Sequence, residues 1–91
     1  MTTITRCYTL SYCPWCKRTK RFFTEHNISF ECVDYDLASP EEQARIEEEI
    51  STYSGGHISF PYVVIEGEVV MGYDPDRYRD LLHLEDAYRW P

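Results

Sequence analysis

The amino-acid sequence predicts a single α/β domain, spanning residues 1–91, in which a four-stranded mixed sheet carries helices on both faces. The chain has 91 residues, which is enough for one hydrophobic core and too few for two. In the first half, short β-branched and aromatic runs flank a segment of helical periodicity. In the second half, two strands follow each other directly between two helices. The predicted order of elements is therefore βαβ and then αββα.

The first half is predicted to be a parallel βαβ unit with a right-handed crossover. Residues 4–10 (ITRCYTL) form its first strand and end at a Ser-Tyr-Cys-Pro turn. Pro14 suits the first position of a helix, where the N–H that proline lacks is not needed. This helix runs to about His26, and residues 28–35 (ISFECVDY) form the second strand. The helical spacing predicts one face made of Trp15, Thr19, Phe22, Phe23 and His26.

The second half is predicted to be a helix, a β-hairpin and a last helix. The segment Ser39-Pro40-Glu41-Glu42 is a capping-box pattern, and its helix continues to about Tyr53 before Gly55-Gly56. Residues 61–65 (PYVVI) and 68–71 (EVVM) are joined by the tight turn Glu66-Gly67, which indicates a hairpin. Asp74-Pro75 opens the last helix, whose apolar residues are Tyr78, Leu81, Leu82 and Leu84.

Composition and charge exclude several classes of protein. The net charge of -7 argues against a nucleic-acid partner. No apolar run approaches the roughly 20 residues that cross a bilayer, and the N-terminal residues do not have the pattern of a signal peptide. We therefore expect the protein to be in the cytoplasm, where the four cysteines are mostly reduced. We also expect a monomer.

Charge is unevenly distributed along the chain. Four of the nine basic residues lie within five positions, at Lys17, Arg18, Lys20 and Arg21, whereas residues 41–49 carry five of the sixteen acids. One interpretation is that these patches orient the docking of a protein partner. The alternative is that both are ordinary solvated helix faces.

The motif Cys13-Pro14-Trp15-Cys16-Lys17 is the candidate for chemistry. Cys13 lies at the predicted helix start, where free N–H groups and the helix dipole stabilise a thiolate. Pro14 and Lys17 are expected to contribute to this activation. Thiols in such settings have pKa values of roughly 3.5–7.5 and attack disulfides as thiolates. Cys16 is close enough in sequence to resolve the mixed disulfide.

Other uses of the two thiols remain open at this point. A structural zinc site needs four ligands, usually in two close pairs, and the chain has one such pair. We therefore expect no metal site. A carrier of iron–sulfur clusters or metal, using the Cys13 thiolate, is the alternative function. A redox-inactive docking module and two simply buried thiols are further possibilities.

Three motifs together resemble the glutaredoxin family and glutaredoxin-like redoxins. They are Tyr-Thr-x-x-x-Cys-Pro-Trp-Cys-Lys-x-Thr-Lys at residues 8–20, Gly-Gly-x-x-x-Phe-Pro-x-Val-x-Ile at residues 55–65, and Gly-Tyr-Asp at residues 72–74. The match runs from Ile4 to about Leu84 in the family's order of elements. The resemblance implies a thioredoxin fold and a dithiol–disulfide oxidoreductase that acts as an electron carrier.

The resemblance also implies roles for individual residues. Cys13 would be the attacking thiol and Cys16 the resolving one, with a reversible Cys13–Cys16 disulfide and no bound cofactor. The Phe60–Pro61 bond would be cis, and its backbone would hold the substrate. The remaining predicted substrate-binding residues are Tyr12, Trp15, Gly72, Tyr73 and Asp74.

The electron donor is predicted less directly. Typical glutaredoxins carry a Lys three residues before the first catalytic Cys, where this chain has Leu10, and many have Gly-Gly at Gly72-Tyr73. The aromatic residue resembles relatives that receive electrons from a thioredoxin- or ferredoxin-dependent reductase. In some of them ribonucleotide reductase is the acceptor. We expect disulfide-containing protein substrates and such a reductase as donor, with glutathione as the other possible co-substrate.

Cys7 and Cys32 lie in the two predicted parallel strands and are expected to be neighbours in the sheet. One interpretation is that both are small buried hydrophobic residues. The other is that they form a second disulfide or a regulatory thiol.

Overall fold

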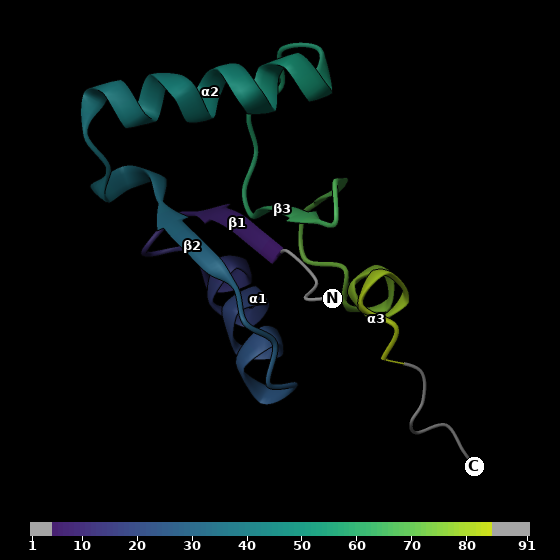
Figure 1. Ribbon diagram of the computed structural model, residues 1–91. Helices are drawn as coiled ribbons and strands as arrows, with labels where there is room; N and C mark the ends of the chain where they lie inside the picture. The colour runs from purple at the N-terminus through teal and green to yellow at the C-terminus, as the bar shows by residue number, and fades with distance from the viewer. Residues whose placement is uncertain (1–4, 85–91) are drawn as a thin grey trace.

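The computed structural model describes residues 5–84, and the elements follow the predicted order (Figure 1). The strands and helices are β1 (Thr5–Thr9), α1 (Pro14–Glu25), β2 (Glu31–Asp34), the 3-10 helix η1 (Tyr35–Leu37), α2 (Pro40–Ser54), β3 (Tyr62–Ile65), β4 (Glu68–Met71) and α3 (Pro75–Leu82). None of the helices in this part of the chain is long and apolar enough to span a bilayer.

The sheet has the strand order β2-β1-β3-β4. β1 pairs with β2 in parallel, with Cys7 opposite Cys32, so the prediction that these two residues are neighbours is confirmed. β1 and β3 are antiparallel, as are β3 and β4, which confirms the mixed sheet with its C-terminal hairpin.

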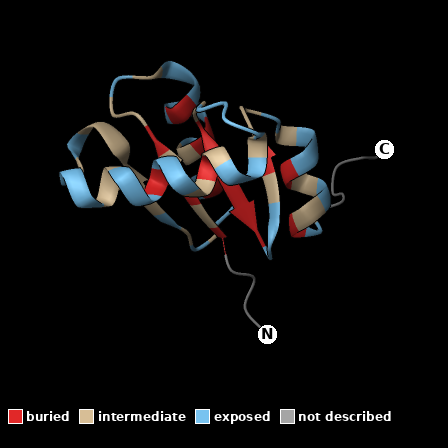
Figure 2. Cartoon of the chain, turned by 90° about the horizontal axis from the view of Figure 1, so that it is seen from above, coloured by how far each residue is buried: buried red, intermediate tan, exposed pale blue. Residues whose placement is uncertain are grey.

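Helices cover both faces of the sheet, as predicted. α2 lies on one face, and α1 and α3 lie on the other (Figure 1). Each face has its own buried cluster, and Figure 2 shows the buried positions turned toward the sheet. The cluster under α1 and α3 consists of Cys7, Phe22, Phe23, Val63, Ile65, Val70, Tyr78 and Leu82. The cluster under α2 consists of Ile46, Ile50, Tyr62 and Val64.

Local signals in the sequence set most helix ends. Pro14 opens α1 and Pro40 opens α2, and the Ser39 hydroxyl accepts a hydrogen bond of 3.2 Å from the Glu42 N–H. In a complete capping box the Glu42 carboxylate would also accept the Ser39 N–H. Here that carboxylate pairs with Arg45 instead. α2 ends at Gly55, whose φ of 79° is in the left-handed region that glycine adopts without strain.

Two predicted details are wrong. The second strand was expected over residues 28–35, but it spans only Glu31–Asp34, because pairing with β1 begins at Glu31 and the chain enters a 3-10 turn after Asp34. The predicted face of α1 also differs, because His26 is exposed and Cys16 is buried together with Thr19, Phe22 and Phe23, whereas the exposure of Trp15 was expected. Leu84 lies just beyond the end of α3, and Ile4 lies outside the described residues.

Candidate redox site

Cys13 and Cys16 lie at the N-terminal end of α1, as predicted. Cys13 is the residue before the helix, with extended φ and ψ of -88° and 123°, and its carbonyl accepts the Lys17 N–H at 3.1 Å. Its own N–H donates to the Leu10 carbonyl at 3.1 Å. Cys13 is partly exposed, whereas Cys16 is 0% exposed. One thiol therefore reaches the surface and the other lies directly beneath it.

The surroundings of the two sulfurs push their pKa values in opposite directions. Partial burial raises the pKa of Cys13. The backbone N–H groups of Cys16 and Trp15 and the Cys16 thiol lower this pKa by more than burial raises it, so the pKa lies below its ordinary value. Burial raises the pKa of Cys16 to about 12, and the nearby Cys13 thiolate adds to the effect, although the Leu10 N–H at 3.4 Å opposes it. The exposed sulfur therefore ionises more readily than the buried one.

A cavity of about 260 Å³ is lined in part by Trp15, the residue between Pro14 and Cys16 in the motif. Its lining residues are Trp15, Phe60, Pro61, Gly72 and Tyr73. All five were predicted as substrate-binding residues, and the structure brings them together from three separate segments of the chain. The Phe60–Pro61 bond is cis, which confirms that prediction.

The loop between β4 and α3, which forms one wall of the cavity, is held by hydrogen bonds. The Gly72 N–H donates to the Pro61 carbonyl at 2.8 Å, and the Tyr78 hydroxyl donates to the Gly72 carbonyl at 2.8 Å. The same hydroxyl is 3.1 Å from the buried Thr19 hydroxyl on α1. Tyr78 therefore ties the cavity wall to the helix that carries the thiols. The sequence indicated Tyr78 only as an apolar residue of the last helix.

A second contact that the sequence did not indicate fixes the turn before Cys13. Asp36, in η1, accepts the Ser11 N–H at 2.8 Å and the Ser11 hydroxyl at 2.5 Å. The hydrogen bonds of Ser11 also lower the pKa of Asp36. This pair connects the turn before Cys13 to the segment after β2. No local sequence pattern joins residues that lie so far apart in the chain.

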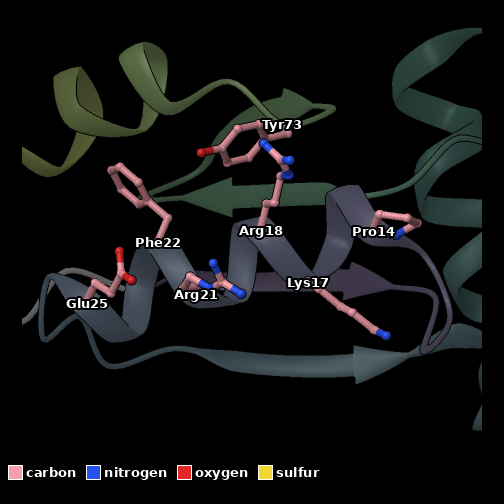
Figure 3. Close-up of a pocket in the computed structure, with 7 residues that line it drawn as sticks. All are labelled: Pro14, Lys17, Arg18, Arg21, Phe22, Glu25 and Tyr73. Carbon is pink, nitrogen blue, oxygen red and sulfur yellow. The ribbon is translucent and has the colours of Figure 1, made fainter.

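A basic groove of about 530 Å³ runs along α1 next to the cavity (Figure 3). Its lining residues are Pro14, Lys17, Arg18, Arg21, Phe22, Glu25 and Tyr73. The Arg18 guanidinium lies over the Trp15 ring at 5.0 Å, and Trp15 stacks on Tyr73 at 5.8 Å. This stack separates the groove from the cavity, and Tyr73 lines both. Lys17 leaves the helix in another direction, away from Tyr73 (Figure 3).

Tyr12 and Asp74 do not line the cavity, although both were predicted as substrate-binding residues. Tyr12 is 68% exposed at the turn before Cys13. Asp74 caps α3, where its carboxylate accepts the Arg77 N–H at 3.2 Å. Trp15 is 54% exposed. Within residues 5–84 no three His, Cys, Asp or Glu side chains are grouped in a way that would hold a metal ion.

Comparison with known proteins agrees with this arrangement. The family model described as Glutaredoxin matches residues 6–70. An uncharacterized glutaredoxin-like 8.6 kDa protein in the rubredoxin operon of Clostridium pasteurianum is 31% identical over 67 residues, covering 74% of this chain and 81% of that protein.

Solved structures give the same result. The glutaredoxin of Archaeoglobus fulgidus is 33% identical, with a TM-score of 0.77 over 86% of this chain and 84% of the other. Methanoredoxin of Methanosarcina acetivorans is 31% identical, with a TM-score of 0.79 over 87% and 83% of the two chains. The matched region includes both thiols, the cavity residues Phe60 and Pro61, and most of the sheet. The chain therefore belongs to the glutaredoxin family and has the thioredoxin fold.

Proposed function

We propose that this protein is a dithiol–disulfide oxidoreductase of the cytoplasm that reduces disulfides in proteins, or mixed disulfides with glutathione, through Cys13 and Cys16. Membership of the glutaredoxin family supports thiol–disulfide chemistry in general. The observation that carries the specific proposal is the contrast between the two thiols, one partly exposed with a lowered pKa and one buried with a raised pKa. Both steps of a dithiol exchange follow from this contrast.

In the first step, the Cys13 thiolate attacks one sulfur of the substrate disulfide. A Cys13–substrate bond forms, the substrate S–S bond breaks, and the second substrate sulfur leaves as a thiolate that takes up a proton. The cavity lined by Trp15, Phe60 and Tyr73 would receive the chain around the substrate sulfur.

In the second step, Cys16 loses its proton and attacks the Cys13 sulfur, which releases the reduced substrate. A thiol with a pKa of about 12 is a poor nucleophile, but the Cys13 thiolate is one of the groups that keep this pKa high. That thiolate disappears once Cys13 is bonded to the substrate. The pKa of Cys16 therefore falls at the stage when Cys16 must react. The product is the Cys13–Cys16 disulfide, which a donor reduces with two electrons.

For the donor, we favour a protein reductase of the thioredoxin- or ferredoxin-dependent type over glutathione. Leu10 precedes the catalytic turn where a Lys would meet a glutathione carboxylate, and losing one charge-assisted contact costs about 1.5–3 kcal/mol. The Tyr73 ring lies against Trp15 at the cavity wall and occupies space that a second glycine would leave open. A disulfide-containing enzyme such as ribonucleotide reductase is a candidate acceptor.

The variant Cys16→Ser tests the exchange itself. With a disulfide-containing peptide it should accumulate a mixed disulfide at Cys13, visible as an added mass that a reductant removes. Cys13→Ser should form no adduct at residue 16, because the thiol there is buried and protonated. Equal adduct formation in both variants, or none in either, would contradict the proposed roles.

The donor is tested by equilibrating the native protein with graded reduced and oxidised glutathione and counting species by intact mass. A transition near or below about -270 mV with little glutathione adduct would support a dedicated reductase. A transition at about -200 to -230 mV, with adduct building up in Cys16→Ser, would show that glutathione is the donor.

A further inference from the structure

The protein has a second pair of thiols, which the proposed exchange at Cys13 does not use. Cys7 on β1 and Cys32 on β2 are directly paired in the parallel ladder, and both pack into the cluster under α1 and α3. Neighbouring strands lie about 4.8 Å apart, and disulfides join Cα atoms separated by roughly 4.4–6.8 Å. The backbone therefore holds the two cysteines at a separation that a disulfide can span.

The two thiols differ from each other in the same way as the catalytic pair. Cys7 is 1% exposed, whereas Cys32 is partly exposed. Their mutual contact and burial raise the pKa of Cys7. The contact with Cys7 lowers the pKa of Cys32, and the nearby Thr9 hydroxyl and Lys20 ammonium lower it further. Cys32 is therefore suited to attack, and Cys7 is suited to resolve.

Polar groups gather around the Cys32 sulfur. The Thr9 hydroxyl lies 3.1 Å from this sulfur and donates to the Asp34 carboxylate at 2.6 Å. The Lys20 ammonium pairs with the same carboxylate at 2.9 Å. The Lys20 ammonium places a positive charge near the position where a thiolate would form, and the Asp34 carboxylate partly opposes this effect.

We propose that Cys7 and Cys32 form a second thiol–disulfide couple, which closes into a disulfide between β1 and β2 when small disulfides such as oxidised glutathione are in excess. The Cys32 thiolate attacks the small disulfide, so that a mixed disulfide forms and one small thiol leaves. The Cys7 thiol then gives up its proton and displaces the second small thiol. One small disulfide is reduced to two thiols while the chain gains one S–S bond, and Cys13 takes no part.

The test uses the double variant Cys13→Ser/Cys16→Ser, in which only Cys7 and Cys32 remain. It is equilibrated with graded ratios of oxidised to reduced glutathione, quenched by alkylation and weighed intact. The expected result is the loss of both thiols without retained glutathione. Trypsin, cutting after Arg6, Lys17, Arg21 and Arg45, should then give peptides 7–17 and 22–45 joined by a reducible bond.

Three results would overturn the proposal. They are two free thiols at every ratio that oxidises Cys13–Cys16 in the native chain, a glutathione adduct on Cys32 that Cys7 never displaces, or a link between two chains. The same measurement on the native chain covers the case in which the double variant does not fold. There the proposal requires all four thiols to disappear at high ratio and Cys32 to be joined to peptide 7–17.

Matched variants locate the attacking thiol. In the double-variant background, Cys7→Ala should trap a glutathione adduct on Cys32, whereas Cys32→Ala should take up none, because Cys7 is buried. Lys20→Met should move the pH profile of Cys32 alkylation upward, and Lys17→Met on the same helix should leave it in place. Equal profiles for the two Met variants would exclude Lys20 as a positioning residue. Because no variant requires Cys13 to react, these results are independent of the proposed function.

Discussion

Replacing Tyr78 by Phe removes the hydroxyl that ties the cavity wall to α1 and leaves the ring. That oxygen donates to the Gly72 carbonyl at 2.8 Å and lies 3.1 Å from the Thr19 hydroxyl, and both Tyr78 and Thr19 are 0% exposed. A typical hydrogen bond contributes about 0.5–1.5 kcal/mol, and a buried group left without a partner costs about 1–3 kcal/mol. Because the Thr19 hydroxyl loses a buried partner, we expect Tyr78→Phe to lower the free energy of unfolding by about 2 kcal/mol.

Thermal and urea unfolding measure this loss. For a domain of this size, 1 kcal/mol shifts Tm by about 4–8 °C, so a decrease of about 8–16 °C is expected. Because Gly72 forms part of the cavity wall, KM for a peptide disulfide should also rise more than kcat falls. Tyr53→Phe is the control, since Tyr53 is 57% exposed, and it should change neither quantity. A Tyr78→Phe protein within about 0.5 kcal/mol of the native one would refute the reasoning.

Two further predictions follow from the cited pKa shifts. Cys16→Ala removes a thiol that lowers the pKa of Cys13, so the pH profile of Cys13 alkylation should move upward; an unchanged or lower midpoint would contradict the assignment. Burial raises the pKa of Glu49. Hydrogen bonds from Arg6 at 2.9 Å and Tyr8 at 2.7 Å lower this pKa by more than burial raises it, so the net shift is downward. The stabilisation by this carboxylate is therefore present above its unfolded pKa of about 4.3 and lost as pH falls through the lower folded value. Glu49→Gln should lower the free energy of unfolding by about 1 kcal/mol or less at pH 7 and should leave it unchanged in strong acid. Urea unfolding at a series of pH values measures this difference. A loss of stability that does not depend on pH would contradict the ion pair between Glu49 and Arg6.

The sequence was sufficient to predict the ends of helices and the position of turns wherever a single residue determines the local backbone conformation. Pro14 starts α1, Ser39 caps α2, and Gly67 allows the hairpin turn with a φ of 84°. It was insufficient for the second strand, because a strand extends only as far as its partner pairs with it. Ile28 and Phe30 have strand-forming side chains and pack on the core, yet they lie outside the ladder.

The same distinction applies to the site. The cavity residues could be predicted because short motifs carry them, including Phe60-Pro61 and Gly72-Tyr73. The role of Tyr78 depends on a hydroxyl that contacts both Gly72, six residues earlier, and Thr19 on the distant α1. No sequence motif links Tyr78 to Thr19, which lies 59 residues away. Long-range hydrogen bonds of this kind require the three-dimensional structure.

The placement of α1 and α2 on opposite faces of the sheet gives the molecule an electric polarity. Three cations of α1, Lys17, Arg18 and Arg21, line the groove beside the site, whereas α2 carries a dense row of glutamates on the far face. The field of such a dipole rotates an acidic partner toward the thiols before contact and turns a basic partner away. Since salt screens this torque over about 10 Å at 0.1 M, the association rate with an acidic partner should fall as ionic strength rises.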